Sequence, residues 1–214
     1  MIGQLTRWRI GWRWYGITFV GVPLVGLAAL GTHAALGGAL AIESIPSVLL
    51  VSPVMFVFVA VLGGGLDEEM GWRGYALPQL QTVFSPVAAN VILGVLWTCW
   101  HLPLFFTGGL FTQARFAVYL VQTVALSFVL AWLYNGTGGS LLIAVFAHSV
   151  HNVTTNAVEN LAFRPFAGTL SIAQFEMIEA LVWVIVALVL IVLTRGSLNV
   201  RRMSEPANSD SASS

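Results

Sequence analysis

Residues 46–66 read PSVLLVSPVMFVFVAVLGGGL, and this apolar run leads directly into the charged sequence DEEMGWR at 67–73. A helix needs about 20 mostly apolar residues to cross a hydrocarbon core of about 30 Å, because each residue adds about 1.5 Å to its length. The run meets this requirement. It therefore predicts a membrane-spanning helix over Pro46–Leu66, with Leu77 as the alternative end if the helix continues through the charged residues.

Five further stretches fit the same criterion, and each is bounded by Gly, Pro, Asn or a charged residue. They are Tyr15–Leu36, Pro86–Phe106, Ala114–Tyr134, Ser140–Asn160 and Phe175–Thr194. The sequence thus predicts an all-α fold, a polytopic integral membrane bundle of about six transmembrane helices. We expect one helical domain over residues 1–200, followed by a Ser-rich, disordered tail at 201–214.

The composition agrees with a location in the bilayer. Of the 214 residues, 57% are hydrophobic and 8% are charged, whereas a soluble domain carries about 25% charged residues. The 9 basic residues are all Arg and are scattered along a chain of zero net charge. This pattern offers no basic patch and excludes a nucleic-acid partner. Cys99 is the single cysteine, which excludes an intramolecular disulfide and a cysteine-based zinc knuckle.

The arginines also predict the orientation of the chain, because basic residues near helix ends accumulate on the cytoplasmic side. Two clusters flank the first and last spans: Arg7, Arg9, Arg13, Arg195, Arg201 and Arg202. With an even number of spans, both termini are cytoplasmic in a multi-pass protein of the cell membrane, and the outer loops hold Arg115 and Arg164. The alternative is that the first span is a signal peptide cleaved near Ala34 and Ala35, which would leave an odd number of spans.

Three groups of polar residues lie within or beside the apolar segments, where ionisable side chains cost several kcal/mol and are functional candidates. They are residues 67–73, 97–101 and 148–152. In the first group, Glu69 and Arg73 are four residues apart, which favours an ion pair on one helix face. Glu68 points about 100° away and is free to face another helix. The alternative interpretation is that the acidic run marks a solvated helix end.

The second group contains His101, which lies four residues after Trp97 and therefore on the same helix face. Pro103 disfavours regular helix just before it, so we expect a bend that turns the imidazole toward an opening. The alternative is a histidine that only packs inside the bundle.

In the third group, His148 and Asn152 project from one face of a helix, with His148 about 12 Å into the span that starts at Ser140. Two polar side chains on one stripe of a membrane helix need partners from another helix. His151 points at a neighbouring angle, where we expect it to cap or pair locally. His33 lies in a Gly/Ala-rich segment after the first span, where a structural or interfacial role is expected.

The order and spacing of these groups resemble the CPBP intramembrane proteases, the family of CAAX proteases and bacteriocin-processing or abortive-infection proteins. Three motifs carry the resemblance: Glu68, Glu69 and Arg73 (EExxxR); Trp97 and His101 (an aromatic residue and a His four positions later); and His148 and Asn152. The similarity covers about residues 46–160, and three motifs in this order are more specific than any one of them.

The resemblance implies a role for each catalytic candidate. Glu68 and His101 would activate the water that attacks the scissile carbonyl. His148 and Asn152 would stabilise the oxyanion, and donors of this kind commonly contribute about 3–4 kcal/mol each.

The resemblance also implies a supporting role for Glu69 and Arg73, which would orient their helix. Trp97 stands where the family usually has Phe, a change that is conservative in shape. We expect no metal or other cofactor, because the residues are competent without one. The alternative is a catalytic zinc ion held by Glu68, His101 and His148.

The leading hypothesis is therefore an intramembrane endopeptidase that acts on a membrane-associated peptide or protein. Two alternatives belong to other functional classes. One is a non-enzymatic immunity or sequestration protein that keeps the motifs as structural contacts. The other is a transporter that relays protons, although the sequence has no visible inverted repeat of the kind expected for one. A zinc-dependent endopeptidase with the same residues is a further alternative.

Overall fold

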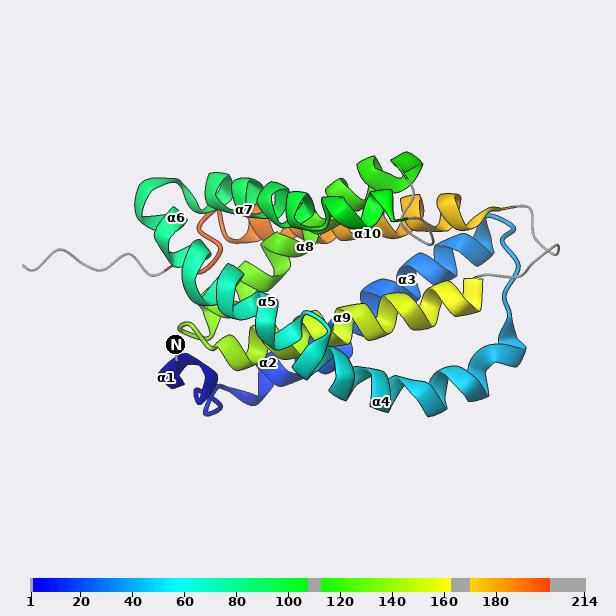
Figure 1. The fold of residues 1–214 in the computed structure, drawn as a ribbon, viewed down its shortest axis with the longest axis horizontal. Helices are drawn as coiled ribbons and strands as arrows, with labels where there is room; N and C mark the ends of the chain where they lie inside the picture. Colours follow the sequence, from blue (N-terminus) through cyan, green and yellow to red (C-terminus); the bar gives the residue numbers. More distant parts are fainter. Residues whose placement is uncertain (1, 108–112, 163–169, 201–214) are drawn as a thin grey trace, which may run out of the picture.

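The computed structural model describes residues 2–107, 113–162 and 170–200 (Figure 1). The regular structure in these ranges is helical, and no strand occurs in them, which confirms the predicted all-α fold. The α-helices are α1 (Ile2–Leu5), α2 (Trp12–Gly16), α3 (Val22–Ala35), α4 (Ile45–Leu62), α5 (Gly65–Gly71), α6 (Leu77–Val83), α7 (Pro86–Trp100), α8 (Phe116–Gly136), α9 (Leu141–Ala162) and α10 (Ile172–Leu193). Single π-helical turns, Ile17–Gly21 and Trp72–Ala76, join α2 to α3 and α5 to α6.

Within the described ranges, 4 helical stretches are long and apolar enough to cross a membrane: Trp12–Ala35, Ile42–Val83, Phe116–Gly136 and Ile172–Leu193. They overlap four of the six predicted spans. The second stretch passes both of its predicted ends and reaches Val83. It is interrupted at Gly63 and Gly64, where the long helix α4 ends and the short helix α5 begins. This break places the acidic residues at the start of a new helix.

The other two predicted spans form helices of a different kind. Helix α7 has 15 residues and ends at Trp100, so the expectation of one continuous helix to Phe106 is wrong. A 3-10 helix, Leu102–Phe106, follows it. Regular α-helix thus ends shortly before Pro103, as expected, because proline has no N–H to continue the α-helical ladder.

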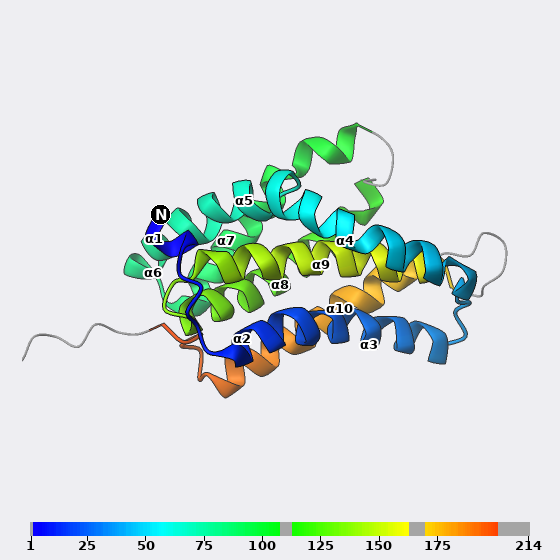
Figure 2. The same cartoon turned by 90° about the horizontal axis from the view of Figure 1, so that it is seen from below.

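Helix α9 is 22 residues long and runs through the middle of the bundle (Figure 2). It contacts α3, α4, α5, α8 and α10. Its polar side chains therefore meet protein rather than lipid, which explains why its sequence is less apolar than that of the outer helices.

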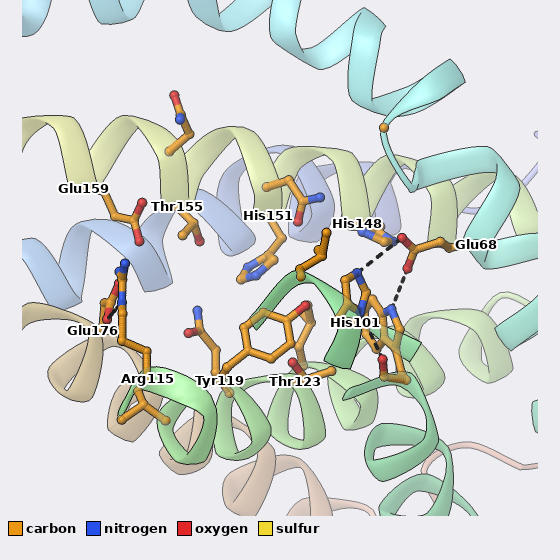
Figure 3. Close-up of a pocket in the computed structure, with 18 of the residues that line it drawn as sticks. Glu68, His101, Arg115, Tyr119, Thr123, His148, His151, Thr155, Glu159 and Glu176 are labelled. Atoms are coloured by element: carbon orange, nitrogen blue, oxygen red, sulfur yellow. Dashed lines mark hydrogen bonds and ion pairs between the residues drawn. The ribbon is translucent and has the colours of Figure 1, made fainter. Parts of the chain in front are cut away.

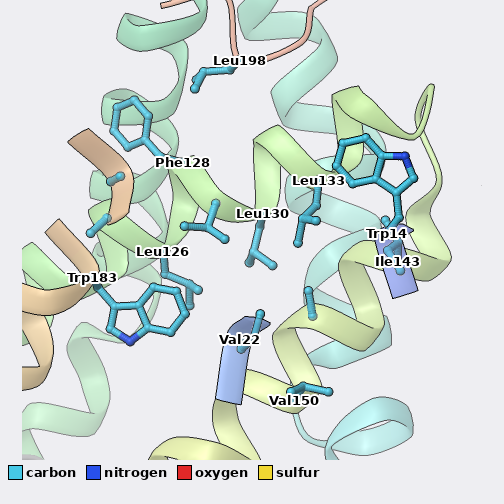
Figure 4. Packing of buried hydrophobic residues seen from close by; sticks show 14 of the residues in the cluster. Trp14, Val22, Leu126, Phe128, Leu130, Leu133, Ile143, Val150, Trp183 and Leu198 are labelled. Carbon is cyan, nitrogen blue, oxygen red and sulfur yellow. The ribbon is translucent and has the colours of Figure 1, made fainter. Parts of the chain in front are cut away.

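The apolar core lies where α8 and α9 pack against the flanking helices (Figure 4). Leu130, Leu133 and Ile143 are fully buried there, and Trp183 of α10 closes one side. Helix α4 shows the opposite pattern, since apolar side chains such as Leu50 project away from the protein. An apolar outer surface of this kind matches a hydrocarbon environment, and the chain is an integral membrane protein.

Both ends of the described chain reach the same end of the bundle (Figure 1). The guanidinium of Arg7 donates to the carbonyl of Gly138, and the hydroxyl of Ser140 donates to the carbonyl of Arg7 at 2.7 Å. Asn135 donates to the carbonyl of Leu198 at 3.0 Å. The turn between α8 and α9 thus holds both ends, as an even number of crossings requires. The expected tail at 201–214, with Arg201 and Arg202, and the loop residue Arg164 lie outside the described residues.

Candidate active site

The three polar groups converge on one cavity of about 350 Å³ between α5, α7, α8 and α9 (Figure 3). All four residues predicted to be catalytic line it: Glu68, His101, His148 and Asn152. His101 lies at the end of α7, where the α-helix changes to the 3-10 helix Leu102–Phe106.

The position of Glu68 depends on Gly64, the residue just before α5, where the backbone packs closely against the Glu68 side chain. Gly64 has a φ of +104°, and its N–H donates to the Asp67 carboxylate at 3.1 Å. A Cβ at Gly64 would lie 2.9 Å from Glu68 Oε1 and 3.3 Å from His148 Nε2. Only glycine combines this φ with such close approach. Asp67 therefore caps the helix, while Glu68 faces the cavity.

The predicted ion pair of Glu69 and Arg73 is present, with 2.9 Å between Oε1 and Nη1. Both side chains are 0% exposed, so the alternative of a solvated helix end is wrong. The same Glu69 oxygen lies 2.8 Å from His148 Nδ1. Because a carboxylate only accepts hydrogen bonds, Nδ1 carries the hydrogen in this contact. The contact was not predicted, because residues on separate helices have no shared periodicity.

Arg73 lies on the π-helical turn Trp72–Ala76 and is held from a second side by Trp97. Its guanidinium lies 4.6 Å from the centre of the indole ring, a cation–π arrangement. Single π-helical turns recur at functional sites, because they rotate the side chains that follow them. Arg73 thus links α5, α7 and α9 through Glu69, Trp97 and His148.

The two oxygens of Glu68 have different neighbours (Figure 3). The indole Nε1 of Trp97 donates to Oε2 at 2.5 Å. His101 Nε2 lies 3.6 Å from Oε1, a separation longer than a direct hydrogen bond. Oε1 and the His101 ring thus face each other, and one polar atom of a ligand beside them in the cavity can contact both.

The end of α7 orients His101. Its backbone N–H bonds to the carbonyl of Thr98, which leaves the carbonyl of Trp97 without an amide partner. The imidazole caps this carbonyl, with 3.0 Å between Nδ1 and the oxygen. A carbonyl only accepts, so Nδ1 carries the hydrogen and Nε2 points at Glu68. His101 thus makes polar contacts through both ring nitrogens, so the alternative that it only packs inside the bundle is wrong.

His151 lines the same cavity and does not cap or pair locally as expected. Its ring packs edge-on against Trp183, with 4.9 Å between the centres. His33 is remote from the cavity. It is buried, and its ring packs edge-on against Phe175 with 5.4 Å between the ring centres. This position agrees with the expected structural role.

The cavity also contains polar residues that the motifs did not indicate. Tyr119 and Gln122 of α8 form part of its wall, and an ion pair of Arg115 with Glu176 lies at the far end near Glu159 (Figure 3). The sequence of α9 does indicate that the polar lining continues beyond the motifs. Polar side chains recur there every three or four positions: His148, Asn152, Thr155, Asn156 and Glu159. This stripe extends the polar lining along about 16 Å of helix.

A bound metal ion would need several donor side chains close together. In the described ranges, no three His, Cys, Asp or Glu side chains group closely enough to hold one. His148 directs Nδ1 at Glu69, and His101 directs Nδ1 at a carbonyl. This leaves Nε2 of each ring for another partner, as in metal-binding histidines, so the expected absence of a metal and the alternative zinc site of Glu68, His101 and His148 both stay predictions.

Comparison with known proteins gives a match in the region of the cavity. Residues 50–154 match the family described as type II CAAX prenyl endopeptidase Rce1-like. Through this segment, the chain is similar to the CAAX-protease (CPBP) family. The segment contains all three polar groups, from Glu68 to Asn152.

A CAAX prenyl protease 2 of Methanococcus maripaludis is similar to the chain and is 27% identical over 108 residues. The similar region covers 47% of this chain and 39% of the relative's length. The CAAX-protease resemblance thus rests on the motif-bearing core, while the first and last helices extend beyond the family match.

Proposed function

We propose that this protein is an intramembrane endopeptidase that hydrolyses a peptide bond in a membrane-associated peptide or protein. The observation that carries the proposal is the pairing of Glu68 Oε1 with His101 Nε2, 3.6 Å apart, in a cavity inside a membrane protein. Similarity to the CAAX-protease family over residues 50–154 supports the same reaction class.

In the proposed reaction, one water donates hydrogen bonds to Glu68 Oε1 and to His101 Nε2. Glu68 takes a proton as the water oxygen bonds to the scissile carbonyl carbon. The carbonyl oxygen becomes an oxyanion. When the C–N bond breaks, the leaving nitrogen takes the proton from Glu68. This leaves one carboxyl product and one amine product, with Glu68 returned to its starting form.

Asn152 and His148 are the proposed oxyanion donors, and they differ in what they need. The Asn152 amide always carries hydrogens that it can donate. His148 gives one hydrogen to Glu69, so it can donate from Nε2 only when both ring nitrogens carry hydrogen. Asn152 is therefore the donor that is independent of protonation.

We also propose a location in the cell membrane with both termini in the cytoplasm. The flanking arginine clusters support this orientation, since basic residues accumulate on that side. The shared position of Arg7 and Leu198 at one end of the bundle supports a common side for both termini.

The test of the endopeptidase proposal is comparative peptidomics of membranes that contain the wild-type protein, Glu68→Gln or no protein. We expect cleavage products that depend on the wild-type protein and disappear with Glu68→Gln. The amide keeps the shape of the side chain but cannot act as the base. If Glu68→Gln and His101→Ala both kept the biological effect of the protein without any cleavage product, sequestration of a partner would replace proteolysis as the proposal.

A further inference from the structure

Trp97 contacts both members of the proposed catalytic pair. Its indole Nε1 donates to Glu68 Oε2 at 2.5 Å, and its carbonyl accepts from His101 Nδ1 at 3.0 Å. The side chain is 3% exposed, so water does not compete effectively for the indole N–H. The same ring lies against Arg73 on its face and against His148 at 5.2 Å.

These contacts assign different tasks to the two oxygens of Glu68. The indole N–H engages Oε2, so the carboxylate cannot rotate freely about its last bond. Oε1 is then the oxygen directed at His101. A hydrogen bond from a neutral donor to a carboxylate is charge-assisted and is stronger than one between neutral groups. The short contact therefore restrains the orientation of the base.

The indole is the only part of Trp97 that can make this contact. A phenylalanine ring would fill much of the same space but carries no N–H. The backbone carbonyl, by contrast, stays with any residue at this position. A side-chain replacement thus removes the contact to Glu68 and leaves the contact to His101.

We propose that Trp97 is a positioning residue, whose indole N–H holds the Glu68 carboxylate with Oε1 directed at His101. This inference rests on the proposed function, because it gives Glu68 the role of base. The competing explanation is that Trp97 only fills space in the core. A space-filling role depends on the shape of the ring and not on the N–H.

The first arm of the test is spectroscopic and requires no substrate. In detergent, the protein with ¹⁵N-labelled indoles has signals from 8 tryptophans, and Trp97→Phe identifies the Trp97 signal by its loss. We expect Glu68→Ala to move this signal upfield more than any other indole signal. The matched control Asp67→Asn alters the adjacent acid and should leave the signal in place, because Asp67 bonds to the Gly64 N–H instead.

The second arm measures cleavage of a substrate identified by peptidomics. We expect Trp97→Phe to lower kcat about 10- to 100-fold and to change KM less than about threefold, since the lost bond orients the base rather than the substrate. Benzothienylalanine at the same position keeps the double ring but has no N–H, and it should show the same loss. The control is Trp100→Phe, because Trp100 is exposed on the same helix and should tolerate the change.

The outcomes separate the inference from the proposed function. The positioning role is overturned if the Trp97 indole signal does not shift in Glu68→Ala. It is also overturned if the benzothienylalanine variant keeps the wild-type kcat. Benzothienylalanine also covers the case in which Trp97→Phe fails to fold. Wild-type turnover in Glu68→Gln overturns the proposed function instead, and it removes the role of Trp97 as a partner of the base even if the spectroscopic contact is present.

Discussion

Glu69 and His148 are separated by 79 positions in the sequence, yet Glu69 Oε1 and His148 Nδ1 lie 2.8 Å apart. The same oxygen accepts from Arg73 at 2.9 Å, so one buried carboxylate holds a guanidinium and an imidazole together. The adjacent Glu68 makes neither contact and faces the cavity. Two neighbouring acids thus have separate tasks, and substitutions at them should have separable effects.

The first prediction concerns Glu69→Gln, which should mainly destabilise the protein. The change removes the charge that compensates Arg73, whose side chain is 0% exposed. Breaking a buried ion pair typically costs about 3–5 kcal/mol. We expect a clear fall in the melting temperature of the detergent-extracted protein and in its expression level.

The control is Glu68→Gln, which should keep a melting temperature close to that of the wild type. Its side chain is 17% exposed, and the uncharged amide can still accept from Trp97. Equal melting temperatures for Glu68→Gln and Glu69→Gln would contradict the separate roles of the two acids.

The second prediction concerns Asn152→Ala, which should lower kcat more than it raises KM. Loss of one oxyanion donor typically reduces kcat about 10²- to 10³-fold, because the contact strengthens as charge develops on the oxygen. The measurement is the initial cleavage rate over a range of substrate concentrations. Asn156→Ala is the matched control, since Asn156 lies one turn further along α9 and lines the same cavity away from the Glu68 end. A rise in KM alone for Asn152→Ala would indicate substrate binding instead.

The third prediction concerns Gly64→Ala, which should reduce both stability and turnover. A residue with a side chain is strained at a φ of +104°, and such strain costs about 1–3 kcal/mol. The new Cβ would also lie 2.9 Å from Glu68 Oε1 and displace the base. Gly71→Ala is the control at the end of the same helix. A Cβ there meets nothing within 4 Å, so the variant should be neutral or slightly more stable. Similar melting temperatures and rates for both variants would refute this account of Gly64.

The fourth prediction is that purified protein keeps its activity after exhaustive chelation. The described side chains present no three-donor group for a metal ion, and the proposed water activation uses Glu68 and His101 alone. Metal analysis should accompany the cleavage assay. Stoichiometric zinc, together with turnover that chelation abolishes and zinc restores, would favour the metalloenzyme alternative.

The local features of this protein follow from its amino-acid sequence. Apolar segments of sufficient length predict helices in a bilayer, and the four-residue spacing of Glu69 and Arg73 predicts their ion pair. Both follow from the regular rise and rotation of one helix. The three polar groups also indicated the residues that line the cavity, since ionisable side chains are rare inside membranes.

How the three polar groups meet depends on the packing of the helices. The contacts of Trp97 with Glu68 and of His148 with Glu69 join separate helices, and the position of His151 at the cavity depends on the rotation of α9. The periodicity of one helix carries no information on its rotation or tilt against another. These quantities result from packing, from the break at Gly64 and from the early end of α7. The physical reason is that a helix determines its own side-chain directions, whereas its neighbours determine what those side chains contact.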